Sequence, residues 1–375
     1  MLLNDLQEGR QPAGKGDELM KDNSILAIIP ARSGSKSVID KNIREIDGKP
    51  MLAYSIGHAK QSKHIGRVIL STDSEKYAQL GREYGAEVPF LRPAEYATDT
   101  ALDFDVFYHA LSWLKEHEGY EPELVVQLRP TYPVRNVNDI DNMIEQMLAD
   151  PSIDSMRCIA PAGEVAHKMW LLGEDKAHDL SDPSKGFTPE AGKGISIRPL
   201  LTDIPEAYNM PRQQLPRVYY QNACIDVIRS HVILEEKSMS GTNIAGYVMS
   251  ENYDIDTEEE FKRAEERLKI LNGGKRFVFD IDGVIAGFRK GLDYDSAPPN
   301  EPVIKVVNKL YDLGNEIILH TARGYVTGID WSELTKKQME DWGVKYHELH
   351  FGKPNADYYV DDKSLDLQRL LDYFG

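Results

Sequence analysis

The tripeptide Asp-Ile-Asp occurs twice in the sequence, and each copy offers two carboxylates. The first copy supplies Asp254 and Asp256, and the second, which follows an apolar run, supplies Asp280 and Asp282. On an extended strand, side chains two residues apart point to the same face, and Mg²⁺ prefers hard carboxylate oxygens. The first copy is therefore a candidate magnesium site, and its alternative is a solvated strand end that caps the helix after it.

A loop with glycine and small hydroxyl residues follows the first apolar segment of the chain. It spans residues 30–37 and contains Arg32 and Gly34, and Lys41 lies just beyond it. Backbone N–H groups of such a loop can approach a phosphate closely, and the basic side chains add positive charge. The GxxxxGK pattern of P-loops is absent. The loop predicts a phosphate site, with an ordinary strand-to-helix turn as the alternative.

Strands and helices alternate along the first part of the chain. Short apolar runs predict buried strands, and longer segments with helical periodicity predict helices. The predicted strands are 25–29, 68–70 and 124–128, and the predicted helices are 51–61, 74–84 and 103–116. This alternation favours an α/β fold, a parallel sheet with helices on both faces. Ligands of such sheets bind at the carboxyl ends of the strands, where the loop at 30–37 lies.

The alternation restarts after a highly charged helix predicted at 257–271. Residues 272–276 contain two glycines, which indicate a helix stop and a short linker. Beyond them the predicted strands are 277–280, 316–320 and 358–361, and the predicted helix is 303–313. The sequence thus predicts two α/β domains, at 24–272 and 275–375, after a flexible polar extension at 1–23.

Composition limits the functions open to the chain. It has 375 residues, and its 44 basic against 61 acidic residues give a net charge of −17. We therefore expect no nucleic-acid and no anionic-membrane partner. Its two cysteines, Cys158 and Cys224, are far apart, which argues against a disulfide framework or a thiolate metal site. No apolar run approaches the roughly 20 residues of a membrane span, and the start lacks a signal-peptide pattern, so a cytoplasmic protein is expected.

Seven motifs of the first domain occur in an order that resembles the CMP-sialate synthetase family (acylneuraminate cytidylyltransferases). They are IIPARSGSK with the KN after it, IDGKPMLAYSI, STDSE, LRPAEYATDTA, LRPTYPVR, RQQLPRVYYQNACI and YDIDTEEEF. Each motif is weak alone, whereas seven in order are specific, and the resemblance covers residues 24–270. It implies a nucleotidyltransferase-type, Rossmann-like mixed sheet and a homo-oligomer, a dimer or higher. The implied reaction joins CTP to a 2-keto-3-deoxy sugar acid (a nonulosonate) and releases pyrophosphate.

The resemblance also implies roles for individual residues. Those implied to bind the CTP phosphates are Arg32, Ser35 and Lys41, with Arg32 and Lys41 acting in catalysis. Those implied to contact the nucleoside are Asn42 and Arg92. Those implied to bind Mg²⁺ are Asp254 and Asp256. Those implied to bind the sugar are Lys168 and Arg212, at its carboxylate, and Gln213, Tyr219 and Asn222.

Four positions depart from the family pattern. Ser37 replaces a usual glycine, and Arg129 stands where sialate-specific members often have glutamine. Tyr132 and Val134 replace a serine and a leucine. Cytidylyl transfer is still expected, while these changes leave the sugar acid open. The alternative acceptor is a non-sialate acid or a phosphorylated or phosphonylated molecule.

Four motifs of the second domain resemble the haloacid dehalogenase superfamily, and most closely its small phosphatases from bacterial capsule and surface-sugar gene clusters. The motif residues are, in chain order, Asp280 and Asp282, Thr321, Lys353, and Asp361 with Asp362. The resemblance implies that Asp280 attacks phosphorus to form an aspartyl-phosphate, and that Asp282 protonates the leaving group and then activates water. It further implies phosphoryl binding by Thr321, charge neutralisation by Lys353, and a second Mg²⁺ bound by the four aspartates.

The stretches between these motifs are too short for a full cap domain, so the resemblance implies a small capless Rossmann domain with an open site. Residues 294–302 are expected to form a wall loop rather than a helix, and Arg323 is a further candidate substrate contact. Together the two domains suggest consecutive steps: removal of phosphate from a sugar-acid phosphate, and transfer of CMP to the freed acid. The alternative is a non-catalytic second domain that serves oligomerisation.

Overall fold

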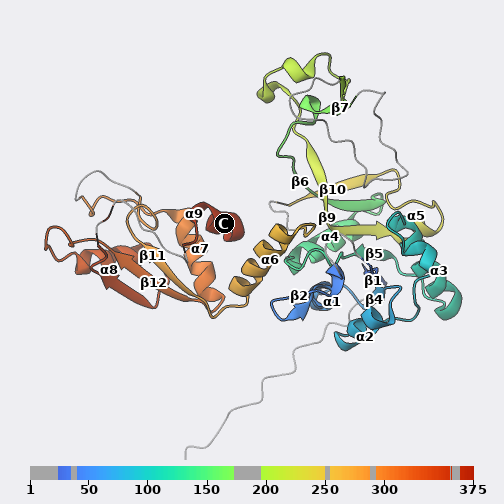
Figure 1. The fold of residues 1–375 in the computed structure, drawn as a ribbon, viewed down its shortest axis with the longest axis horizontal. Helices are drawn as coiled ribbons and strands as arrows, with labels where there is room; N and C mark the ends of the chain where they lie inside the picture. Colours follow the sequence, from blue (N-terminus) through green and yellow to red (C-terminus); the bar gives the residue numbers. More distant parts are fainter. Residues whose placement is uncertain are drawn as a thin grey trace, which may run out of the picture. The chain divides into compact units, whose positions relative to one another are not determined.

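The computed structural model describes residues 24–34, 40–172, 196–249, 254–287, 293–354, 356 and 364–375 (Figure 1). The chain forms two compact units. The first unit comprises residues 1–33, 55–130 and 135–249, and the second comprises residues 34–54, 131–134 and 250–375. The extension predicted at 1–23 and the site residues Ser35, Asp361 and Asp362 lie outside the described residues. The domain boundary expected near residue 273 stays a prediction.

Strands and helices alternate through the first unit. Its main strands are β1 (Ile25–Pro30), β4 (Arg67–Ser71), β5 (Leu124–Gln127), β6 (Ser155–Pro161), β9 (Tyr219–Arg229) and β10 (Ile244–Val248). Its α-helices are α1 (Met51–Gln61, whose first turn belongs to the second unit), α2 (Glu75–Glu83), α3 (Asp103–Glu118), α4 (Val137–Ala149) and α5 (Ser230–Leu234). A separate antiparallel pair is formed by β7 (Trp170–Leu172) and β8 (Ile197–Pro199).

The central sheet of the first unit is mixed, with the strand order β10-β6-β9-β5-β1-β4. β1 is parallel to β4 and β5, and β10 is parallel to β6, whereas β9 is antiparallel to both of its neighbours, β5 and β6. The mixed sheet implied by the family resemblance is therefore confirmed, and the parallel sheet predicted from the alternation alone is wrong at β9. After β6 the chain comes back to the sheet at the same end, so β9 runs back along β6 without a crossover.

Both faces of the parallel part of this sheet are covered. On one face, α3 and α5 pack against the strands, with Phe107, Leu111 and Val232 in the same buried cluster as Leu26 and Ile28 of β1. The alternate residues of β1 point to the opposite face and are equally buried. A strand buried on both sides reads as a continuous apolar run, which is why the sequence predicted β1, β4 and β5 well.

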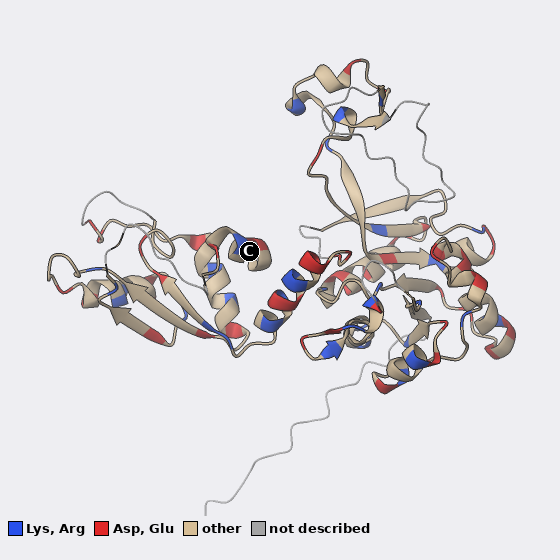
Figure 2. Cartoon of the chain, in the orientation of Figure 1, with Lys and Arg blue, Asp and Glu red and all other residues tan. Residues whose placement is uncertain are grey.

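The second unit contains a small hairpin that packs on a long charged helix. The hairpin strands β2 (Glu45–Ile46) and β3 (Lys49–Pro50) are joined by Asp47 and Gly48, whose φ angles of 47° and 77° suit a two-residue hairpin turn. The helix is α6 (Glu258–Leu271), and Ile46 lies with Phe261 and Leu268 in one buried cluster. Figure 2 shows residues of both charges along α6.

A second α/β arrangement begins after α6. The strands β11 (Arg276–Asp280), β12 (Glu316–Thr321) and β13 (Glu348–Phe351) form a parallel sheet in that order. The helices α7 (Glu301–Asp312), α8 (Ser332–Asp341) and α9 (Leu367–Phe374) contribute to one buried cluster with it. The wall loop expected at 294–302 ends earlier than predicted, because Pro302 suits the first turn of α7. The strand predicted at 358–361 lies outside the described residues.

Two predictions drawn from composition concern cysteines and membranes. Cys158 and Cys224 are both free and buried, and burial raises the pKa of each thiol, so neither is a reactive thiolate. Across the described ranges, no helix combines the length and the apolar character that a membrane crossing needs.

Candidate active sites

The predicted phosphate loop leaves the sheet at the carboxyl end of β1, beside the end of β4. Pro30 is paired with Ser71, and the N–H of Ala31 donates to the Ser71 carbonyl at 2.9 Å. Just beyond, Ser33 donates twice to Asp73, from its backbone N–H at 2.8 Å and from its hydroxyl at 2.7 Å. The loop is thus held by the connection after β4.

The two arginines predicted to serve CTP differ in their surroundings. Arg32 forms an ion pair of 2.8 Å with Asp99, and both side chains are partly exposed, by 32% and 44%. Arg92 is only 5% exposed, and its guanidinium donates to the hydroxyl and the carbonyl of Ser71 and to the carbonyl of Tyr96. Burial lowers the pKa of Arg92 to about 10. Arg92 therefore braces the end of β4, and its contact with a nucleoside stays a prediction.

Lys41 and the first Asp-Ile-Asp tripeptide, which are far apart in sequence, come together in the second unit. The Lys41 ammonium donates to the Ile255 carbonyl at 2.9 Å and to Asp256 at 3.0 Å. Burial raises the pKa of the Asp254 carboxyl, against a hydrogen bond from Thr131 and the nearby charge of Lys41. Asn42, next to Lys41, is buried. A lysine predicted to bind phosphate therefore lies beside the predicted metal motif, and both roles stay predictions.

The five residues predicted to bind the sugar lie in the first unit, between η3 (Ala166–Lys168) and β9. The Lys168 ammonium donates to the Tyr208 carbonyl at 3.2 Å, and Arg212 donates to the Gly163 carbonyl. Gln213 lies in the short helix η7 (Arg212–Gln214) and is exposed. On β9, Tyr219 is exposed, while Asn222 is buried and accepts from the N–H of Cys224. Within the described part of the chain, the side-chain hydrogen bonds of Lys168 and Arg212 thus go to backbone carbonyl oxygens.

The second Asp-Ile-Asp tripeptide lies at the carboxyl end of β11, where the parallel strands β12 and β13 also end. Lys353 reaches Asp280 at 2.5 Å, and the backbone N–H of Lys353 donates to the Thr321 carbonyl at 3.1 Å. The Thr321 hydroxyl lies 3.4 Å from Asp282. Four of the six predicted residues thus meet at one edge of the sheet, and the other two are outside the described residues.

Arg323, a weak candidate in the sequence, turns out to be the main partner of Asp282. Its guanidinium bonds both carboxylate oxygens of Asp282, at 2.7 to 3.1 Å, and its side chain is fully buried. Its other nitrogen donates to Thr335 at 3.1 Å and to Gln338 at 2.6 Å. The ring of Tyr294 lies 4.7 Å from it. Arg323 is therefore fixed in one place and holds Asp282 with it.

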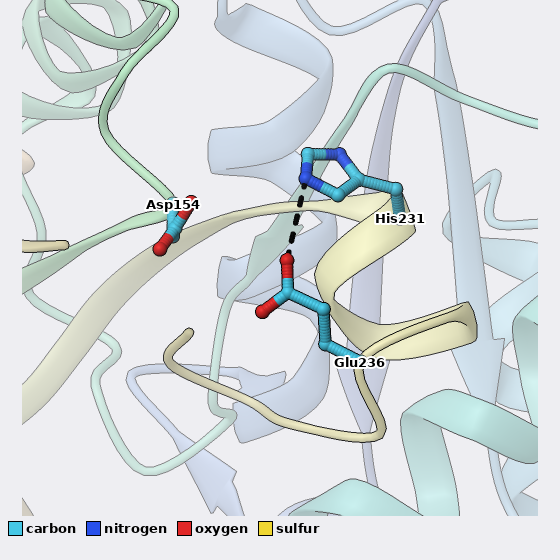
Figure 3. A group of neighbouring side chains, drawn as sticks. All are labelled: Asp154, His231 and Glu236. Carbon is cyan, nitrogen blue, oxygen red and sulfur yellow. Dashed lines mark ion pairs between the residues drawn. The ribbon is translucent and has the colours of Figure 1, made fainter. Parts of the chain in front are cut away.

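Both Asp-Ile-Asp groups fit a hard divalent cation in their chemistry, because each presents two carboxylates, whose oxygens such cations prefer as ligands. One further group of described residues has ligand-like spacing: Asp154, His231 and Glu236 (Figure 3). Asp154, however, already accepts the backbone N–H groups of Thr242 and Asn243, at 2.8 Å each. This group therefore closes a loop onto β6 and makes a poor metal site.

Sequence reasoning gave no role to Asp73 or Asp99, although both lie in motifs that it singled out. Asp73 belongs to STDSE and Asp99 to LRPAEYATDTA. The available signal was an acid directly after a strand that neighbours the phosphate loop. It could not be used from the sequence, because it depends on β4 lying beside β1.

Comparisons with known proteins match the N-terminal two thirds of the chain. A family model described as Cytidylyltransferase matches residues 26–172. A Post-translational flagellin modification protein B from Campylobacter coli is 31% identical over 252 residues, which are 67% of this chain and 97% of that protein.

Of two further relatives, one is named a cytidylyltransferase and the other a synthase. An N-acylneuraminate cytidylyltransferase from Escherichia coli is 41% identical over 64% of this chain, and the chain spans 51% of the length of that relative. A CMP-N,N'-diacetyllegionaminic acid synthase from Campylobacter jejuni is 32% identical over 66% of this chain and 96% of that protein.

Proposed function

The chain belongs to the cytidylyltransferase family, and from this premise we propose that it transfers CMP from CTP to a nonulosonic acid. The observation that carries the proposal is the meeting of Lys41 with Asp256, in a chain whose relatives are named for CMP-sugar synthesis. In this reaction the anomeric hydroxyl of the acid attacks the α-phosphorus of CTP. The bond from that phosphorus to the bridging oxygen breaks, and pyrophosphate leaves.

The proposed role of each residue follows from its charge. Arg32, Ser35 and Lys41 would offset the triphosphate charge, while Lys168 and Arg212 would bind the acceptor carboxylate. Asp254 and Asp256 would hold Mg²⁺, which neutralises charge on the phosphates when bound. Asn42 and Arg92 are proposed for the nucleoside, and Gln213, Tyr219 and Asn222 for the sugar. A homo-oligomer is proposed on the family resemblance.

A second activity is proposed for the C-terminal region, residues 275–375: Mg²⁺-dependent hydrolysis of a sugar phosphate. What supports it is the cluster of Asp280, Asp282, Thr321 and Lys353 at one sheet edge. Asp280 would attack phosphorus and release the sugar hydroxyl, which takes a proton from Asp282. Water would then attack the aspartyl-phosphate, giving its proton to Asp282 and releasing phosphate.

The two activities fit one order of events. Phosphate would leave a nonulosonate phosphate first, and the freed acid would then receive CMP. The test is to incubate the full chain with CTP, Mg²⁺ and a panel of nonulosonates, each free and as its 9-phosphate, and to follow pyrophosphate, phosphate and CMP-sugar by mass spectrometry. CMP-sugar from both forms, with phosphate released only from the second, is the expected result. No CMP-sugar from any nonulosonate would exclude the proposed acceptor class.

The alternatives are a non-sialate or phosphonylated acceptor, and a C-terminal region that serves only oligomerisation. Hydrolysis of p-nitrophenyl phosphate separates the second alternative from the proposal. Its control is Asp280→Asn in the full chain, which removes the nucleophile and keeps the size of the side chain. Hydrolysis equal in both proteins, or absent from both, would leave the oligomerisation role standing.

A further inference from the structure

The turn that opens the phosphate loop is tied to one carboxylate from a neighbouring connection. Asp73 follows β4, and each of its two oxygens accepts one hydrogen bond from Ser33, from the N–H at 2.8 Å and from the hydroxyl at 2.7 Å. Ser33 therefore presents neither its N–H nor its hydroxyl proton to a ligand. Both donors serve to fix the backbone direction of the loop.

The segment that precedes Asp73 is also fixed by a hydrogen bond. Asp73 lies directly after the Ser71–Thr72 segment, and the buried guanidinium of Arg92 bonds the Ser71 hydroxyl at 3.1 Å. Burial works against ionisation of Asp73, but the two Ser33 hydrogen bonds outweigh it and hold the pKa of this carboxyl below its usual range. The carboxylate is thus ionised, partly buried and supported on two sides.

The residue before Ser33 meets a different carboxylate in a different way. Arg32 pairs with Asp99 at 2.8 Å, and both side chains are open to solvent by a third or more. An exposed pair of this kind contributes little free energy, so a more highly charged anion can replace Asp99. Two acids therefore touch consecutive loop residues, one as a fixed support and the other as an exchangeable partner.

We propose that Asp73 is a positioning residue for nucleotide binding, which acts through Ser33 to aim Arg32 at the triphosphate. The proposal rests on the cytidylyl-transfer activity proposed above. Its chemistry is indirect, because Asp73 is an anion and would repel the triphosphate at contact. A backbone that is already fixed at Ser33 reduces the entropy lost in ordering Arg32 when CTP binds.

Asp99 supplies a charge-matched control. Asp73→Ala and Asp99→Ala each remove one negative charge near the same loop. If charge alone mattered, both variants would bind CTP more tightly. If Asp73 positions the loop, its variant raises the Kd for Mg-CTP by about tenfold, while Asp99→Ala leaves that Kd equal or lowers it by about threefold. Asp73→Asn keeps one acceptor for the Ser33 N–H and should fall between Asp73→Ala and the wild type.

Ser33→Ala completes the test as a double-mutant cycle. Because Asp73 acts through Ser33, adding Ser33→Ala to Asp73→Ala should weaken CTP binding less than the two single effects predict together. Binding is measured by calorimetry on the full chain, and the KM for the acceptor should stay unchanged. The proposal would be overturned if Asp73→Ala and Asp99→Ala changed the Kd for Mg-CTP in the same direction. Additive effects of Asp73→Ala and Ser33→Ala on that Kd would overturn it too. If Asp73→Ala lowers Tm, the test passes to the milder Ser33→Ala, which should also raise the Kd for Mg-CTP.

Calorimetry also separates this proposal from the proposed activity. Tight Mg-CTP binding without CMP-sugar formation would contradict the proposed acceptor class. The Kd values of the Asp73 and Ser33 variants would still test the role of Asp73 in that case. Absence of Mg-CTP binding by the wild type would overturn both.

Discussion

The two Asp-Ile-Asp tripeptides share their local structure and differ in their partners. In each, the isoleucine is fully buried, and its N–H donates to the first aspartate, at 3.0 Å in Asp254 and 2.8 Å in Asp280. In the first tripeptide the cation sits on the second aspartate, Asp256, which is 71% exposed. In the second tripeptide each aspartate has its own cation, Lys353 on Asp280 and Arg323 on Asp282. The two tripeptides therefore share their local backbone hydrogen bond, whereas the cations that pair with their carboxylates come from distant parts of the sequence.

This contrast separates two kinds of work. Under the proposed roles, a carboxylate that only binds a metal can stay open to solvent, and Asp256 is exposed in this way. A carboxylate proposed to attack phosphorus or to move a proton needs a fixed direction, which Lys353 and Arg323 provide for Asp280 and Asp282. The predictions below test whether the two tripeptides really differ in this way.

The largest effect is expected from Asp280→Asn. The amide cannot form an aspartyl-phosphate, so phosphate release from p-nitrophenyl phosphate should fall by about 10³-fold or more. CMP transfer by the same protein should stay within about twofold of wild type. Phosphate release and CMP-sugar formation are measured on one preparation. A parallel loss of both activities would contradict two independent sites.

The next effect concerns the lysines that meet the two tripeptides. Lys41→Met should lower CMP transfer about 10²-fold and spare phosphate release, while Lys353→Met should do the reverse. Methionine keeps most of the length of the side chain, so the charge is what changes. The kcat/KM of each activity is the measurement. If Lys41→Met affects only stability, Lys41 serves as a structural brace for Asp256.

A smaller effect should follow from Arg323→Lys. Lysine keeps the charge but cannot bond both oxygens of Asp282 in the fork geometry of arginine, so phosphate release should fall about tenfold. If Asp282 acts on the leaving group, the loss should be greater for a sugar phosphate than for p-nitrophenyl phosphate, whose leaving group needs no proton. An equal loss on both substrates would mean that Arg323 only stabilises the fold.

The sequence predicted best what depends on nearby residues. Apolar runs located β1, β4 and β5, and the D-x-D spacing located both acid pairs. It missed β9, whose residues are exposed at its start and almost all buried later, and whose alternation is interrupted at Ala223, with φ of 58°. It also missed the Asp73–Ser33 contact and the grip of Arg323 on Asp282, because both depend on how separate strands are placed side by side.

The smallest expected effect is on stability without Mg²⁺, and it bears most directly on the contrast between the tripeptides. Asp254 is largely buried, and burial raises the pKa of its carboxyl, so its charge at neutral pH costs free energy. Asp254→Asn should therefore raise the stability of the metal-free protein by about 1 kcal/mol. Asp280→Asn should lower it by a similar amount, because it removes the partly buried ion pair with Lys353.

The pH dependence follows from the same shift. A raised pKa means that the folded protein holds the Asp254 proton to higher pH than the unfolded chain does, so stability falls as pH rises through that window. The advantage of Asp254→Asn should hence be small near pH 4 and full at pH 7, when Tm is measured in EDTA. Added Mg²⁺ should raise the Tm of the wild type by more than that of Asp254→Asn, which keeps only the second proposed magnesium site. An advantage that is the same at both pH values would show that Asp254 carries no buried charge, and the two tripeptides would then differ less than their partners suggest.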